Sequence, residues 1–68
     1  MAQTAESVLD IAKAFLAKAG LTLFIVDGVV YNGQEKSWVV TVRANVFMAP
    51  KKVIVDDASG QVRSYGPA

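Results

Sequence analysis

The sequence predicts one α+β domain, with an N-terminal helix packed on a three- to four-stranded antiparallel meander in the order αβββ. Two observations carry this prediction. The start of the chain repeats apolar residues at helical spacing, and the remainder alternates β-rich runs with turn residues. With 68 residues the chain has room for a single domain, residues 1–68.

A helix is expected over residues 4–19. Thr4 or Ser7 can cap its first turn, and Gly20 suits the position after its last turn, where the backbone often becomes left-handed. The apolar stripe that predicts this helix consists of Val8, Ile11, Ala12, Phe15 and Ala19, widened by Leu9 and Leu16.

The rest of the chain favours strands separated by turns. A first strand over 21–26 resumes at 29–31, and Asp27-Gly28 between them is either a tight turn or a bulge. We favour the bulge because residues 29–31 are short for a hairpin arm. The later elements are a turn at 32–36, strands at 37–47 and 52–56 around a turn at 49–51, a turn at 57–60, a short strand or extended tail at 61–65, and a fraying end at 66–68.

The strand over residues 37–47 has apolar side chains on both faces. Its Trp38, Val40 and Val42 face is expected to pack under the helix together with Val53 and Val55. The helix cannot cover the second face as well. The apolar residues left without a cover are Phe24, Val26, Val30, Val39, Phe47 and Ile54.

An uncovered apolar sheet face predicts a contact surface. We expect Phe24, Val39, Phe47 and Ile54 to bind a protein partner or a second copy of the chain, with Arg43 at the rim setting specificity. A homodimer that pairs the sheet faces, or strand addition at a sheet edge, would bury them. The alternative is that the C-terminal tail or a shifted first strand covers this face within one chain.

Composition argues against an enzyme. The chain has no Cys and no His, which excludes disulfides and removes the usual zinc, copper and haem ligands, so no metal or cofactor is expected. Asp27, Asp56 and Asp57 are interpreted as turn formers rather than a catalytic carboxylate pair. Residues 56–60 lack the ligands of a calcium loop.

The charge balance leaves one alternative function open. Seven basic and six acidic residues give a net charge of +1, which is too even to indicate nucleic-acid or anionic-membrane binding from bulk charge. Arginine and aromatic side chains on a sheet nevertheless suit single-stranded nucleic acid. The residues of this alternative site are Arg43, Lys51, Lys52, Arg63 and Tyr65.

Targeting signals are weak in this sequence. No run of about 18 apolar residues predicts a membrane-spanning helix. Asp10, Lys13 and Lys18 interrupt the stretch that a signal peptide would need. The sequence favours a cytoplasmic location for the chain as given, and a location outside the cytoplasm if a targeting segment was removed.

Several segments together are similar to a known family. The helix, a strand entering Gly33, the run 37–42 and the strand–turn–strand over 53–62 resemble a PepSY-type domain. The pattern of Trp38, Val40, Val42, Asp57, Gly60 and Tyr65 is similar to gas vesicle protein O, although the Arg-rich end of that family is absent. The PepSY resemblance implies a non-catalytic module that binds or restrains a partner, often outside the cytoplasm.

Overall fold

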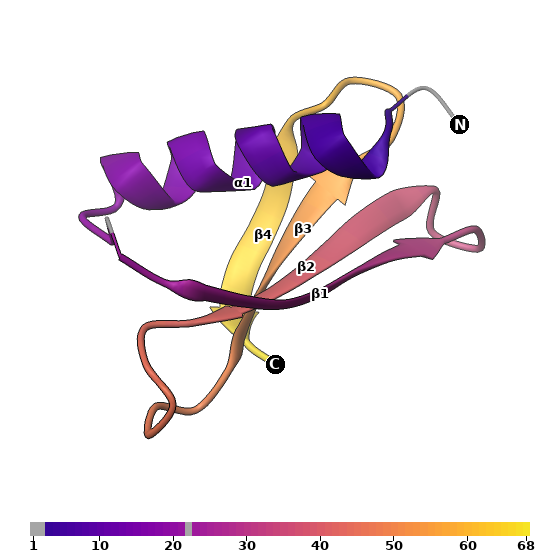
Figure 1. Cartoon of the computed structure of the whole chain (residues 1–68). Coiled ribbons are helices and arrows are strands. Elements are labelled where there is room, and N and C mark those ends of the chain that lie inside the picture. Colours follow the sequence, from indigo (N-terminus) through magenta and orange to yellow (C-terminus); the bar gives the residue numbers. More distant parts are fainter. Residues whose placement is uncertain (1–2, 22) are drawn as a thin grey trace.

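The structure is a computed structural model that describes residues 3–21 and 23–68. One helix lies across one face of a four-stranded antiparallel sheet with strand order β1-β2-β3-β4, so the predicted α+β meander is confirmed (Figure 1). The elements are α1 (Ala5–Lys18), β1 (Ile25–Asn32), β2 (Ser37–Arg43), β3 (Lys51–Asp56) and β4 (Val62–Pro67).

Helix α1 begins and ends where its capping residues place it. The Ser7 amide donates to Thr4 Oγ1 at 3.1 Å, and the Thr4 amide donates to Ser7 Oγ at 3.4 Å, so the two residues cap each other. Gly20 has a φ of 92°, and the Leu21 amide donates to the Leu16 carbonyl at 2.8 Å. This left-handed ending confirms the role expected for Gly20.

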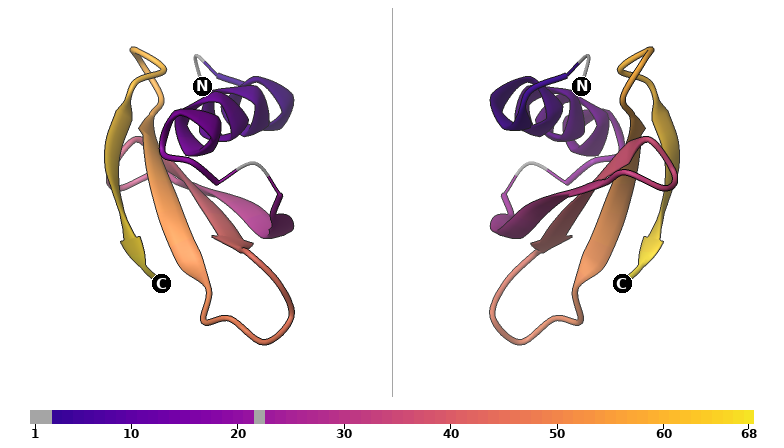
Figure 2. Two further views of the ribbon diagram at one scale, coloured as in Figure 1. Left: turned by 90° about the vertical axis from the view of Figure 1, so that its left-hand side faces the viewer. Right: turned by 90° about the vertical axis from the view of Figure 1, so that its right-hand side faces the viewer.

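The core lies between α1 and the sheet, as the apolar periodicity predicts. The side view in Figure 2 shows the helix on one side of the sheet only. Each fully buried valine or leucine side chain contributes roughly 1.5–3 kcal/mol to folding. The buried apolar residues are Val8, Ala12, Leu16, Trp38, Val40, Val42, Val53 and Val55.

A β-bulge interrupts β1 at Asp27, which confirms the favoured interpretation of Asp27-Gly28. Val26 pairs with Val42 and Gly28 pairs with Thr41, so Asp27 is the extra residue. β1 begins at Ile25 rather than at residue 21, and residue 22 of the expected first strand lies outside the described residues.

Strand β2 ends at Arg43, so the expectation that it reaches Phe47 is wrong. The Asn45 side-chain oxygen accepts a hydrogen bond from the Phe47 amide at 2.9 Å, and the Asn45 carbonyl accepts one from Met48 at 3.1 Å. These bonds give the backbone a turn in place of ladder pairing. Residues 44–50 therefore form a loop, which we call the 44–50 loop.

The C-terminal end pairs with the sheet, and the expectation that it frays is wrong. Pro67 pairs with Lys51, Gly66 pairs with Lys52, and the Ala68 amide donates to the Pro50 carbonyl at 3.2 Å. Proline is tolerated here because β4 is an edge strand, where one side of the backbone needs no ladder partner.

Candidate functional site

The side of the sheet opposite α1, which we call the open face, carries a row of side chains across all four strands. Val30 pairs with Val39, Val39 with Ile54, and Ile54 with Ser64. Val30 is 63% exposed, and Val39 and Ile54 are half-buried. Within the described residues no helix covers this row (Figure 2).

An ion pair borders the row toward the 44–50 loop. Arg43 Nε lies 3.1 Å from Asp27 Oδ2, without the geometry of a hydrogen bond, and both side chains are partly buried. The bulge in β1 positions this contact, because it places Asp27 as an extra residue beside the end of β2. Arg43 is therefore held against its neighbouring strand.

A second charged group borders the row at its other end. β4 has a bulge at Arg63, because Ile54 pairs with Ser64 while Val55 pairs with Val62. The Arg63 guanidinium donates to the Glu35 carbonyl at 2.9 Å and forms an ion pair with Asp56. It thereby joins β4 to β3 and to the turn between β1 and β2.

Asp56 receives a further hydrogen bond from its own turn. The Ser59 amide donates to Asp56 Oδ2 at 2.8 Å. This backbone hydrogen bond and the Arg63 guanidinium lower the pKa of Asp56 from 3.8 to about 2. The carboxylate is thus fixed in its charged form at neutral pH.

Asp57 has a structural role that sequence reasoning missed. Its side chain is buried, and its Oδ1 accepts hydrogen bonds from Trp38 Nε1 at 2.8 Å and from the Gln3 amide at 3.1 Å. Its own amide donates to the Lys36 carbonyl at 3.1 Å. A buried tryptophan needs an acceptor for its indole N–H, and the chain has one tryptophan. The sequence alone does not say which of the turn aspartates accepts this hydrogen bond.

The residues predicted to bind a partner fall into three places. Val39, Ile54 and Arg43 share the open face. Phe24 precedes β1 and packs against the core under the helix. Phe47 lies in the 44–50 loop, 94% exposed, so its expected place on the second face of β2 is wrong.

The residues of the nucleic-acid alternative are also divided between the two sides. Arg43, Lys52 and Arg63 lie on the open face. Tyr65 lies on the helix side, with its ring centroid 5.5 Å from that of Phe15 in an edge-to-face contact. Lys51 lies with Tyr65, its Nζ 5.6 Å from the ring centroid, so the five side chains do not gather at one place.

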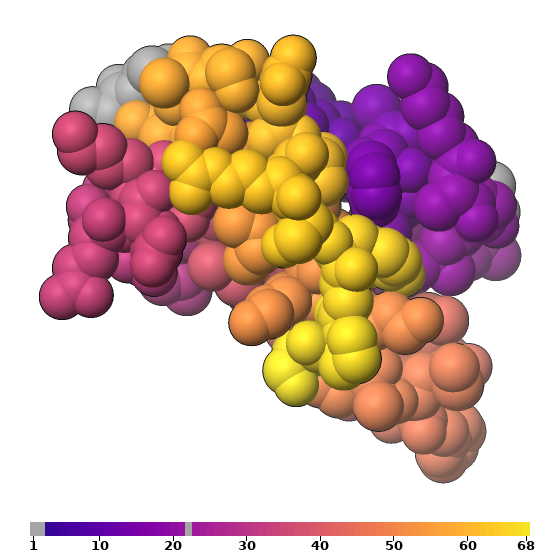
Figure 3. Space-filling view, turned by 180° about the vertical axis from the view of Figure 1, so that it is seen from behind, coloured from indigo at the N-terminus to yellow at the C-terminus, as the bar shows by residue number. Residues whose placement is uncertain are grey.

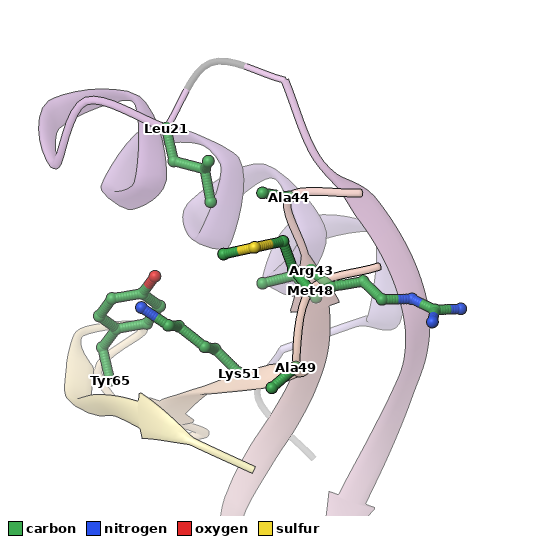
Figure 4. Close-up of a pocket in the computed structure, with 8 residues that line it drawn as sticks. Leu21, Arg43, Ala44, Met48, Ala49, Lys51 and Tyr65 are labelled. Carbon is green, nitrogen blue, oxygen red and sulfur yellow. The ribbon is translucent and has the colours of Figure 1, made fainter. Parts of the chain in front are cut away.

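An apolar pocket of about 160 Å³ lies on the helix side, at the strand ends beside the 44–50 loop. In Figure 4 the Leu21 and Met48 side chains approach it from opposite elements, while the guanidinium of Arg43 points away. Lys51 and Tyr65 lie at its side. Leu21, Val42, Ala44, Met48 and Ala49 make up most of its lining, so the pocket is mainly an apolar packing surface.

The three aspartates considered as a carboxylate pair have separate partners. Asp27 contacts Arg43, Asp56 contacts Arg63, and Asp57 accepts from Trp38. Over residues 3–21 and 23–68, no group of three or more His, Cys, Asp or Glu side chains is arranged to hold a metal ion. In the same part of the chain, no helix is both long enough and apolar enough to cross a membrane.

Comparison of this chain with protein-family models, curated proteins and solved structures finds no match. The resemblance to a PepSY-type domain stays a prediction.

Proposed function

We propose that this protein is a non-enzymatic module that self-associates by pairing the open face of its sheet with that of a second copy. The observation that carries the proposal is the row formed by Val30, Val39 and Ile54, which crosses three strands opposite the helix-covered core. Apolar residues that lie together on a surface commonly mark an interface.

The sheet edges support face pairing over strand addition. Bulges at Asp27 in β1 and at Arg63 in β4 interrupt both edge strands, and both bulged residues are charged. Pro67 near the end of β4 has no amide hydrogen to give to an added strand. Such features are those by which edge strands resist pairing with another chain.

The charges of the open face support a second copy over nucleic acid. Arg43, Lys52 and Arg63 are offset there by Asp27, Asp56 and the adjoining Glu35. A balanced face does not repel its own copy. Single-stranded nucleic acid requires an excess of positive charge along its backbone, and two of these three cations already have carboxylate partners.

The area available indicates a weak and reversible dimer. A typical stable interface removes about 800 Å² from each partner, which is nearly one fifth of the 4352 Å² surface of this protein. The apolar row alone is too narrow to supply that area, so its charged borders must also make contact. Contacts between such solvated charges add little affinity, so the dimer is expected to form only at high protein concentration.

Sedimentation equilibrium over a range of concentrations tests the proposal. The wild-type protein should show a monomer–dimer equilibrium, which Val39→Lys should shift toward monomer. Val30→Lys should do the same with little effect on folding, because Val30 is already mostly exposed on an edge strand. Far-ultraviolet circular dichroism checks that each variant keeps its helix.

The matched control is Ala14→Lys, which adds the same charge on the exposed side of α1. It should leave the equilibrium of the wild-type protein unchanged. A wild-type protein that stays monomeric at every concentration would overturn the proposal, as would equal dissociation by Val30→Lys and Ala14→Lys.

A further inference from the structure

One end of the molecule is built from segments that are far apart in the sequence. Antiparallel pairing brings the start of β1, the end of β2 and the start of β3 to the same end of the sheet. The C-terminal end of α1 and the 44–50 loop lie at this end as well (Figure 1). We call it the loop end.

The loop end carries most of the exposed apolar side chains. Leu23 is 82% exposed and Phe47 is 94% exposed. The 44–50 loop projects from the body of the molecule, as the space-filling view shows (Figure 3). Of the large hydrophobic residues that the described part of the chain exposes, all but Val30 lie here: Leu23, Ile25, Val26, Val46, Phe47 and Met48.

The charged residues of the described chain are separated along the same axis. Of the acidic residues, only Asp27 lies toward the loop end, where it is paired with Arg43. Of the basic residues, only Lys36 and Arg63 lie in the opposite half. The lysines of the loop-end half are Lys13, Lys18, Lys51 and Lys52, and the acids of the opposite half are Glu6, Asp10, Glu35, Asp56 and Asp57.

We propose that the loop end docks on an anionic lipid surface, with the side chains of the 44–50 loop and of Leu23 entering the headgroup region. Apolar side chains bordered by lysines bind such surfaces by burial and by charge attraction together. The separation of charge orients the molecule with its acidic half away from the lipid.

The shape of the loop end favours lipid over a protein partner. The 44–50 loop protrudes, so a protein would need a matching hollow to bury Phe47, whereas a lipid surface adapts to any protruding side chain. The loop end is also distinct from the Val30, Val39 and Ile54 row. Lys52 adjoins both surfaces, whereas Leu23, Phe47 and Lys18 belong to the loop end alone, so substitutions at these residues test lipid docking separately from face pairing.

Vesicle co-sedimentation tests the inference. The wild-type protein should bind vesicles of mixed phosphatidylserine and phosphatidylcholine much more strongly than vesicles of phosphatidylcholine alone. Phe47→Ser should weaken this binding about tenfold, because a phenylalanine no longer leaves water. Lys18→Gln should weaken it by up to about fivefold, since one lysine near the surface is lost.

Matched controls lie away from the loop end. Ala58→Ser changes an exposed apolar residue in the turn between β3 and β4, outside both the loop end and the open-face row, and Lys36→Gln removes a lysine from the opposite half. Both variants should bind vesicles like the wild-type protein. Failure of the wild-type protein to prefer the anionic vesicles, or equal binding by Phe47→Ser and Ala58→Ser, would overturn the inference.

A fluorescent variant tests the orientation directly. Trp38 is buried beside Asp57 and reports little of the surface. Phe47→Trp places a second indole at the tip of the loop, where its emission should shift to shorter wavelength when anionic vesicles are added. An unchanged emission spectrum in the presence of bound vesicles would contradict insertion of this loop.

Discussion

Asp56 and Asp57 are adjacent in the chain and act in opposite surroundings. Asp56 lies at the surface, where it holds Arg63 and the turn that follows β3. Asp57 is turned inward, where it joins Trp38 to the start of the chain at Gln3. The sequence describes both residues as turn formers. In the structure Asp56 has an electrostatic role, and Asp57 anchors the start of α1.

Replacing Asp57 by alanine should be strongly destabilising. The change leaves the buried Trp38 indole N–H without its acceptor, at a cost of about 1–3 kcal/mol in the free energy of unfolding. Asp57→Asn keeps an oxygen at this position and should cost less. Urea unfolding of both variants measures the difference, and equal loss in the two would show that the acceptor oxygen is not what matters.

The lowered pKa of Asp56 predicts acid sensitivity in a defined range. Because the folded state holds the charged form, the stability from this carboxylate is present above its ordinary pKa of 3.8 and is lost as the pH falls through about 2. Asp56→Asn should therefore lose less stability than the wild-type protein across that range. Thermal unfolding at several pH values measures this, and parallel curves would contradict it.

At the scale of elements, the turn between β3 and β4 depends on one glycine. Gly60 has a φ of 74°, and an added Cβ would lie 3.1 Å from Gln3 Nε2 and 3.4 Å from Ile11 Cδ1. A glycine in the left-handed region carries no steric penalty, whereas a residue with a Cβ does. The turn is thereby packed against the start of α1.

Gly60→Ala should lower the free energy of unfolding by about 1–2 kcal/mol. Gly28→Ala is the matched control, because its φ is outside the left-handed region and nothing lies within 4 Å of an added Cβ. That control should be neutral or slightly stabilising. Chemical denaturation compares them, and a Gly60→Ala protein as stable as Gly28→Ala would contradict this account of the turn.

Elements set by residue spacing within one segment could be predicted from the sequence, whereas those set by a particular hydrogen bond or by strand pairing could not. The helix and the Trp38, Val40 and Val42 core face follow from residue spacing, which packing reinforces. The end of β2 does not follow from spacing, because apolar alternation continues through Ala44 and Val46 beyond Arg43. The strand ends there because the Asn45 side chain accepts a hydrogen bond from the Phe47 amide and forms a turn. Residues 66–68 were expected to fray because of Gly66 and Pro67, but proline can take part in an edge strand, and both residues pair with β3.

The candidate site was predictable in part for the same reason. Val39, Arg43 and Ile54 share a face by simple alternation. The partners of the two arginines were not predictable, because Asp27 reaches Arg43 through a bulge and Arg63 reaches Glu35 through a bulge in β4. Phe47 was misplaced because its position depends on where β2 ends.

At the scale of the whole molecule, apolar and charged side chains are distributed unevenly over the surface. The helix covers one side of the sheet, the row of Val30, Val39 and Ile54 lies on the other, and the exposed apolar loop lies at one end. A net charge of +1 conceals a basic end and an acidic end. Averaged composition cannot detect such polarity, because it appears only once antiparallel pairing gathers distant segments.

Pairing of the open face with a second copy can be measured residue by residue, by following amide resonances in nuclear magnetic resonance through a dilution series. If the open faces pair, the amide resonances of Val39, Thr41 and Ile54 shift with protein concentration while those of Val8 and Ala12 under the helix stay fixed. Resonances that do not move with concentration, or that move on α1 and not on the open face, would contradict it.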